Sequence, residues 1–348
     1  MQTDMHFYSI YDFARTIGFY PWAARLIAYS SQHTDYAGCN GLLCAGDNLV
    51  EKIMTSHQPL DAKLKETQNA TTPWLVFHFW PGGENATNPY DRMRCQKNGI
   101  LIQPMMDNVI RHKDENFFLH AAGIALHGMY DCFSHDGFIG LNHQSNRIRN
   151  GSLQVNFGHQ LETTGNHILD ALRTFREKIQ GTVAETFPVG HSAIGTLADQ
   201  PFLRISYETE DGRQITRDNP TNFLAAAEMA FQFLTRILSE NAKYGKATGK
   251  NWSDLEGEVT KLISQEGSLA ERIKNWRKLI KSGLHFPIKA GDGRIWYAPE
   301  AWSYNQLRKQ LEAGRDKDFC NPLLFTIAAR ILRDFILGEM RKAGFILG

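Results

Sequence analysis

The sequence has few cysteines and no arrangement of them that is typical of a disulfide framework. Its 348 residues include five, at Cys39, Cys44, Cys95, Cys132 and Cys320. No Cys-x-x-Cys pair and no dense cluster of cysteines occurs, so a reducing compartment is the simpler interpretation.

Long hydrophobic runs are also missing. No stretch reaches the about 18 apolar residues that a membrane-spanning helix needs. The N-terminal "MQTDMHFYSIYDFARTIG" lacks the basic start and apolar core of a signal peptide. The most hydrophobic stretch, "NPLLFTIAARILRDFILGEM", is interrupted by Arg330, Arg333 and Asp334, which is typical of an amphipathic helix packed on the protein body. We therefore expect a soluble, cytoplasmic protein without a transmembrane segment.

The chain has no excess of charge of one sign. Its 38 basic and 37 acidic residues balance, so no overall field attracts nucleic acid or an anionic membrane, although the balance leaves room for a local basic patch. An apolar fraction of 42% and a charged fraction of 22% are those of a globular protein with a sizeable core. The sequence gives no strong nucleic-acid signal and does not indicate an oligomeric state.

Helical periodicity dominates what is present. We predict helices over residues 5–18, 20–35, 102–134 (one long helix or two in succession), 163–180, 222–238, 253–264, 269–281 and 321–340. Residues 36–48 read as a glycine-containing loop, and "WLVFHFWPGG" as an extended segment or a buried turn. Asp211-Gly212, between alternating polar and apolar residues, is the one convincing hairpin signal. The predicted fold is mainly α, a multi-helix single domain with a small β-hairpin.

The stretch "HAAGIALHGMYDCFSHDGF", residues 120–138, carries three histidines and two aspartates. A buried helix has little reason to hold so many titratable groups, because each costs free energy to desolvate unless it is paired. On a helix His127 and Asp131 stack at i and i+4, and His120 and His135 fall in the same sector of roughly 80°. Imidazole and carboxylate groups are zinc ligands, so we predict a metal site. A buried His–Asp network without metal is the alternative.

Such a site needs ligands from other segments. His6 and Asp35 lie at ends of an antiparallel helix pair and could converge. His78, between aromatic residues, is either a core histidine or a part of the site, and His191 directly follows a glycine. The predicted metal ligands are His6, Asp35, His127, Asp131, His135 and His191, with His78, His120 and Asp199 as additional candidates.

The order of these residues resembles the zinc-dependent phospholipase C and single-strand-specific nuclease superfamily. The resemblance implies an all-helical fold around a cluster of three zinc ions. The sequence also resembles an uncharacterised bacterial family of predicted metal-binding helical proteins. The segments that carry both resemblances are "MHFYSIYDFARTIGF", "IAYSSQHTD", "FHFWPG", "GIALHGMYDCFSHDGFIGL" and "GHSAIGTLADQPF". They cover roughly residues 5–207 and leave the C-terminal third unexplained.

The chain departs from the superfamily pattern at three points. Those proteins use the amino group of a processed N-terminal tryptophan as a ligand, whereas this chain begins "MQTDMH". Their helix has five residues between the aspartate and the next histidine, whereas three separate Asp131 from His135. Their last pair, His-x3-Asp or Glu, has no counterpart here. We therefore expect one or two ions, Zn²⁺ or another divalent metal, rather than three.

A competing match lies in the same stretch. His135-Asp136 is an adjacent His-Asp pair, the signature of the HD phosphohydrolases, which use it to bind a divalent metal on a helix. If that pair carried the chemistry, His127 and Asp131 would need another explanation. Serine-hydrolase, phosphate-loop and HExxH motifs are absent.

These features predict a metal-dependent hydrolase of a phosphate ester, phospholipase C-like or nuclease-like, acting on a small-molecule or lipid substrate. Bound ions would activate water and stabilise charge on phosphorus-bound oxygens, and Asp35 or Asp136 would accept the proton. Residues 1–220 would form the metal-binding core, with residues 221–348 as a helical portion packed on it. The alternative is a non-catalytic interaction protein in which the metal only holds the helices together. In that case four protein ligands would fill the coordination sphere of the ion.

Overall fold

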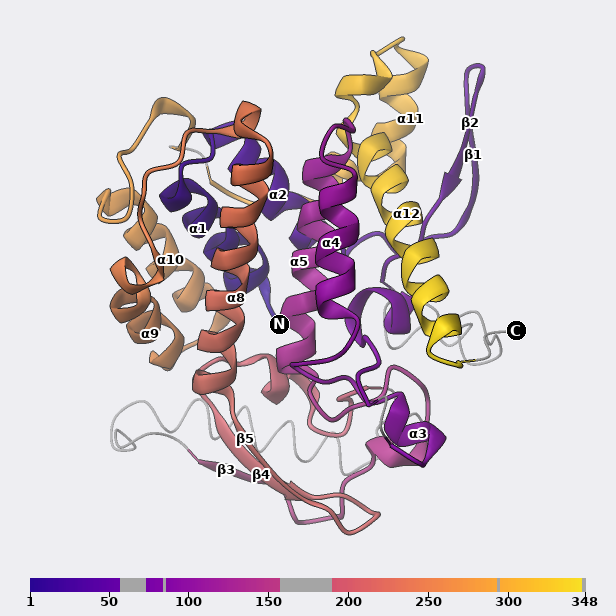
Figure 1. Ribbon diagram of the computed structural model, residues 1–348, viewed down its shortest axis with the longest axis vertical. Coiled ribbons are helices and arrows are strands. Elements are labelled where there is room, and N and C mark those ends of the chain that lie inside the picture. Colours follow the sequence, from indigo (N-terminus) through magenta and orange to yellow (C-terminus); the bar gives the residue numbers. More distant parts are fainter. Residues whose placement is uncertain (57–72, 84–85, 157–189, 293–294, 346–348) are drawn as a thin grey trace.

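The structure is a computed structural model and is mainly helical (Figure 1). Helix α5 (Phe118–Ser134) runs through the middle of the molecule, and every one of its residues is buried. The structure describes residues 1–56, 73–83, 86–156, 190–292 and 295–345, so the helix predicted over 163–180 lies outside the described residues. Among the described residues, no helix combines the length and the apolar character needed to cross a bilayer.

Helix α2 (Pro21–His33) packs tightly against α5 because glycine occupies their crossing point. A Cβ atom at Gly123 would lie 2.3 Å from the Ile27 carbonyl oxygen and 2.5 Å from Ser30 Cβ. Only a residue without a side chain allows that approach. The close packing brings the C-terminal end of α2, with Asp35 just beyond it, beside the middle of α5.

The N-terminal helical region lies against the same part of α5. It consists of η1 (Asp4–Ser9), a wide helical turn, and α1 (Ile10–Ile17), and it ends at Gly18 in the left-handed conformation, as the sequence predicts. A second wide turn, η4 (Trp74–His78), forms where the sequence suggested an extended segment or a buried turn. Both turns contact α5 and each carries one buried histidine, His6 and His78.

The remaining helices complete the layer around α5 and extend it. They are α3 (Pro89–Arg92), α4 (Ile102–Arg111), α8 (Asn219–Glu240), α9 (Glu256–Ser264), α10 (Leu269–Ser282), α11 (Tyr304–Glu312) and α12 (Asn321–Lys342). The predicted 102–134 region is two helices, separated at the polar segment 112–116. Buried side chains from the N-terminal region to α12 form one continuous core, so α8, α9, α10 and α12 pack on the same core as the predicted metal-binding region.

Two small antiparallel sheets flank the helices. The hairpin predicted at Asp211-Gly212 is confirmed as β4 (Arg204–Glu208) and β5 (Gln214–Asp218), and β3 (Gln154–Asn156) adds a third strand beside β4.

The prediction of a loop over residues 36–48 was wrong, because β1 (Gly41–Ala45) and β2 (Asn48–Lys52) form a second hairpin. Its turn, Gly46-Asp47, connects the paired residues Ala45 and Asn48 and is a recognisable two-residue hairpin sequence. Leu43 and Ala45 pack into a small cluster with residues of α11, which stabilises this hairpin against the helices.

Candidate metal centre

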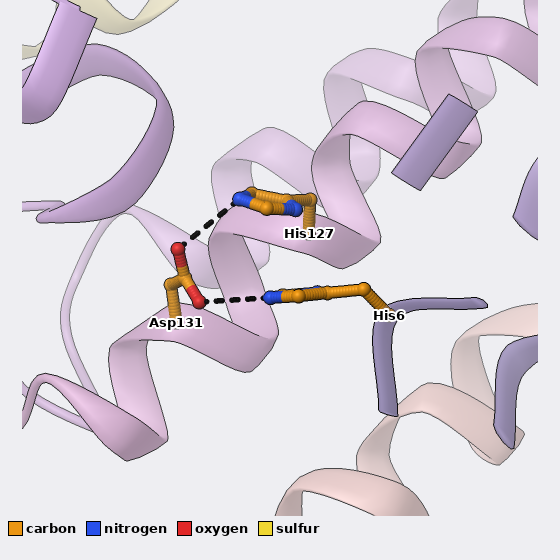
Figure 2. A group of neighbouring side chains, drawn as sticks. All are labelled: His6, His127 and Asp131. Carbon is orange, nitrogen blue, oxygen red and sulfur yellow. Dashed lines mark hydrogen bonds and ion pairs between the residues drawn. The ribbon is translucent and has the colours of Figure 1, made fainter. Parts of the chain in front are cut away.

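The carboxylate of Asp131 lies at the centre of a buried cluster of histidines. Its Oδ1 is 3.1 Å from His6 Nε2, and its Oδ2 is 2.8 Å from His78 Nδ1 and 3.1 Å from His127 Nε2. Figure 2 shows how Asp131 contacts the histidine above it on α5 and the one from η1 at the same time. The α-amino group of Met1 also reaches this carboxylate, with its nitrogen 2.5 Å from Oδ1.

The imidazole rings of His6 and His127 are stacked on each other. Their centroids are 4.0 Å apart and their planes differ by 19° (Figure 2). Both side chains are completely buried, and the two residues come from η1 and α5. The stacking aligns the Nε2 edges of both rings with the two oxygens of Asp131, so the tertiary contact positions two imidazoles for one carboxylate.

Three further histidines are held by backbone carbonyl groups. His78 Nε2 is 2.9 Å from the Thr55 carbonyl oxygen, and His135 Nδ1 is 2.9 Å from the carbonyl oxygen of His78. His191 Nδ1 is 2.7 Å from the carbonyl oxygen of Gly195. A carbonyl can only accept, so each of these ring nitrogens carries the proton and donates it. In a neutral imidazole the other nitrogen then presents a lone pair.

Those lone pairs point at carboxylate oxygens. His135 Nε2 is 3.5 Å from Asp199 Oδ1, and His191 Nε2 is 3.6 Å from Asp199 Oδ2. These distances exceed ordinary hydrogen-bond lengths. Two ligands of a tetrahedral zinc ion lie about 3.4 Å apart, given the usual Zn–N and Zn–O lengths. A ring nitrogen fixed by a backbone carbonyl while its partner faces the ion is also the usual arrangement of metal-binding histidines. The residues therefore fit a divalent cation.

Three groups of residues have ligand atoms close enough to share an ion. Within each group one ligand atom per residue lies within 4.8 Å of the others; the groups are His6–His127–Asp131, Asp35–His78–His127 and His135–His191–Asp199. We call these eight residues the His–Asp cluster. His127 belongs to both of the first two groups. Asp131, a member of the first group, also contacts His78 of the second group through Oδ2.

Asp35 and His191 form the accessible part of the cluster. The side chain of Asp35 is 31% exposed and that of His191 19%, whereas Asp131 is 2% exposed. Asp35 Oδ1 is 3.6 Å from His127 Nε2, and its Oδ2 accepts a hydrogen bond from Gln32 at 3.0 Å. A small molecule reaching the cluster from solvent would meet Asp35 before it meets Asp131.

Burial and charge fix the protonation of most of these groups. Burial, together with the nearby positive charges, lowers the pKa of His6 to about 3. Burial lowers the pKa of His191 to about 4, although Asp199 acts in the opposite direction. Burial alone would raise the pKa of Asp131, but the Met1 amino group and the histidines hold it well below its usual value. At neutral pH the ionised carboxylate of Asp131 thus lies among histidines of which His6 and His191 are neutral, and these are the forms that bind metal.

His78 and the Met1 amino group respond in the other direction. Burial would lower the pKa of His78, but its hydrogen bond to Asp131 and the charge of that carboxylate raise it. Burial would also lower the pKa of the amino group, and the charges of Asp131 and Asp199 outweigh burial and raise it to about 11. Both shifts have the same cause, an excess of negative charge in a buried space.

The structure brings together all six predicted ligands, His6, Asp35, His127, Asp131, His135 and His191, and two of the additional candidates, His78 and Asp199. The third candidate, His120, lies elsewhere. Its ring packs against Trp302 with 5.4 Å between centroids. His120 shares a helix face with His127, but seven residues correspond to about 10 Å along the axis, which is too far for one ion.

Asp136 also lies outside the three groups. Its carboxylate accepts a hydrogen bond from the backbone N–H of Lys97 at 3.3 Å, while the side chain of the preceding His135 faces Asp199. The two members of the His-Asp dipeptide therefore point to different surroundings. Sequence reasoning missed the role of Thr55, whose carbonyl orients His78, because a backbone carbonyl leaves no signal in the residue type.

The fold and the cluster define a mainly helical protein with a buried group of histidines and aspartates that could hold metal ions. The chain belongs to DUF6765, a family of unknown function, which it matches over residues 1–340. No curated protein and no solved structure matches the chain.

Proposed function

We propose that this protein is a metal-dependent hydrolase of phosphate esters that holds Zn²⁺ or another divalent ion in the His–Asp cluster. The observation that carries the proposal is the orientation of His78, His135 and His191. Each has one ring nitrogen bonded to a backbone carbonyl and directs the other toward a carboxylate. His135 and His191 face Asp199 at 3.5 and 3.6 Å, beyond ordinary hydrogen-bond length, whereas His78 is close enough to donate to Asp131 directly. One ring nitrogen held by a backbone carbonyl is common among metal-binding histidines.

Hydrolysis is the chemistry that suits a cluster with a partly exposed carboxylate. A divalent ion bound here would supply positive charge to the phosphate oxygens and acidify a water molecule. Asp35 lies at the accessible edge, is oriented by Gln32 and is close to His127. In our proposal Asp35 accepts the proton of the attacking water. His6 and Asp131 have no access to solvent and serve to hold and orient the ion.

We also propose a cytoplasmic location, which the cysteines support. All five are free thiols, and three of them are buried. Unpaired cysteines are usual in reducing compartments.

The proposal is tested on the full-length protein purified without chelator. Elemental analysis should find a divalent first-row metal in near-stoichiometric amount, and chromogenic phosphodiester and phosphomonoester substrates should be turned over. Turnover should disappear with a chelator and return with Zn²⁺. Less than about 0.1 ion per chain, with none taken up on titration, would count against any metal site. A metal-loaded protein without turnover of phosphodiesters, phosphomonoesters or phospholipids would count against the hydrolase.

A non-catalytic metal staple is the second candidate, and the burial of the first group favours it. His6, His127 and Asp131 come from two separate elements and are almost completely buried, so an ion among them would tie η1 to α5. Binding free energy at such a site is folding free energy. A large loss of thermal stability on metal removal, together with no turnover of any of the substrates above, would support this role.

A further inference from the structure

Helix α10 presents a basic face to solvent. The face consists of Lys274, Arg277, Lys278 and Lys281, all of them exposed. Their spacing of three, four and seven residues places them within a sector of roughly 100°. The inward side of the helix carries buried Arg272 and Trp276 instead. Figure 1 shows α10 at the outer edge of the molecule beside α9, away from the central helix α5.

The charges of this face form no close ion pairs, although the carboxylate of Glu271 interacts electrostatically with Lys274. None of the four side chains forms an ion pair with another residue of the part of the chain that the structure describes. Exposed lysines on α9 and α12 differ, since Lys261 pairs with Glu258 and Lys342 with Glu339. Glu271, in the first turn of α10, is hydrogen-bonded to Ser268 as a helix cap. The basic face therefore has a net positive charge that is exposed to solvent and can attract an anionic partner.

Exposed aliphatic side chains lie at the C-terminal end of the same helix. Leu284 is 58% exposed and Ile288 is 47% exposed. A Cβ atom on Gly283, which caps α10, would lie 3.7 Å from Ile288 Cγ1, so this isoleucine lies directly at the helix end. Lys250 fixes the loop by donating to the carbonyl oxygen of His285 at 2.6 Å. Four positive charges thus continue into an apolar tip held in place by the fold.

We propose that the basic face of α10 and the tip formed by Leu284 and Ile288 bind an anionic lipid surface. Charge complementarity supplies the attraction, and exposed aliphatic groups enter the boundary between headgroups and acyl chains. A single-stranded nucleic acid would be complementary to the same charges, but its bases stack on aromatic side chains, and this tip is aliphatic. The proposal is independent of metal binding and of hydrolysis.

Vesicle sedimentation of the full-length protein tests the proposal. The probes are phosphatidylcholine vesicles with and without about one third phosphatidylserine. The first variant carries Lys274→Gln, Arg277→Gln, Lys278→Gln and Lys281→Gln. Its matched control removes four exposed basic residues elsewhere by Arg111→Gln, Arg308→Gln, Lys309→Gln and Lys317→Gln. The second variant carries Leu284→Ser and Ile288→Ser. Circular dichroism confirms that every variant is folded.

The parent protein should bind the anionic vesicles but not the neutral ones, and its binding should weaken as the salt concentration rises. Each basic side chain near an anionic surface contributes about fivefold, so the α10 variant should bind at least about a hundredfold more weakly. The control variant should bind within about threefold of the parent, and the Leu284/Ile288 variant should lose the binding that remains at physiological salt. Equal binding by the α10 variant and the control, or no parent binding to anionic vesicles, would overturn the proposal. Binding of single-stranded DNA in place of vesicles, with the same dependence on α10, would overturn it in favour of nucleic acid.

Discussion

Asp131 and His78 are 53 residues apart in the chain, yet Oδ2 of the aspartate lies 2.8 Å from Nδ1 of the histidine. The other nitrogen of that histidine is bonded to the carbonyl of Thr55, so this contact joins three separate segments. His78 has no freedom to turn away, and Asp131 is buried on a helix that cannot move without disturbing the core. Contacts of the fold itself thus hold the geometry of the cluster, which is the preorganisation that the proposed metal site would require.

Replacing Asp131 by asparagine should lower Zn²⁺ affinity by at least about tenfold, because a neutral amide is a poorer ligand and leaves the ion's charge unbalanced. Competition with a chromophoric chelator measures this affinity. Asp136→Asn is the matched control, since it makes the same chemical change five residues later and outside the three groups. We expect that control to bind Zn²⁺ like the parent. A loss of affinity in Asp136→Asn alone would support the HD phosphohydrolase interpretation.

Replacing Asp35 by asparagine should reduce phosphodiester turnover by at least about a hundredfold, the usual contribution of a proton acceptor. The side chain is partly exposed, so the melting temperature should change little. Steady-state kinetics of the metal-saturated protein measures the effect, and Asp114→Asn, at an exposed position, is the control. Unchanged turnover in the metal-saturated Asp35 variant would remove this residue from the proposed mechanism.

Replacing Gly123 by alanine should destabilise the protein by roughly 1–3 kcal/mol, because the new Cβ atom overlaps the backbone of α2. Gly257→Ala is the matched control on α9, where a Cβ atom would meet nothing within 4 Å. That change should be neutral or slightly stabilising, since alanine favours helix. Urea unfolding measures both free energies. Equal stability of the two variants would mean that α2 and α5 do not pack as closely as described.

Acid should destabilise the fold through His120, whose pKa is lowered by burial to about 3, with Asn321 acting weakly against the shift. The unfolded chain takes up a proton near pH 6.5 and the folded protein does not, so stability is complete above that value and declines as the pH falls toward 3. Between pH 7 and pH 5 this residue should cost about 2 kcal/mol of unfolding free energy.

His120→Gln removes this group, and its unfolding free energy should therefore fall less steeply with acid than that of the parent. Urea titrations at both pH values give the difference. Zn²⁺ affinity at pH 7 should stay unchanged, because His120 lies outside the His–Asp cluster. Parallel pH profiles for variant and parent would show that His120 is not held neutral by burial.

The sequence by itself determined the helices and the local part of the cluster. Helical periodicity depends on neighbouring residues, so η1 with α1, α2, α8, α9, α10 and α12 appear where the pattern indicates, whereas α11 was not predicted. The i, i+4 spacing of His127 and Asp131 likewise guarantees that their side chains lie on one face of α5. The Gly46-Asp47 hairpin also has a local sequence signal, although the loop prediction for this segment was wrong.

Only the tertiary structure decided which polar residues join. Helical periodicity places His120 on the same face as His127 but does not take account of the axial distance between them. It also does not show that the carboxylate of Asp136, beyond the end of α5, accepts a hydrogen bond from the backbone N–H of Lys97. His78 and Asp199 enter because distant segments pack against α5, and the proton positions of His78 and His135 depend on backbone carbonyls of distant residues. Residue types and spacing carry no record of such contacts, since any residue supplies the same carbonyl group.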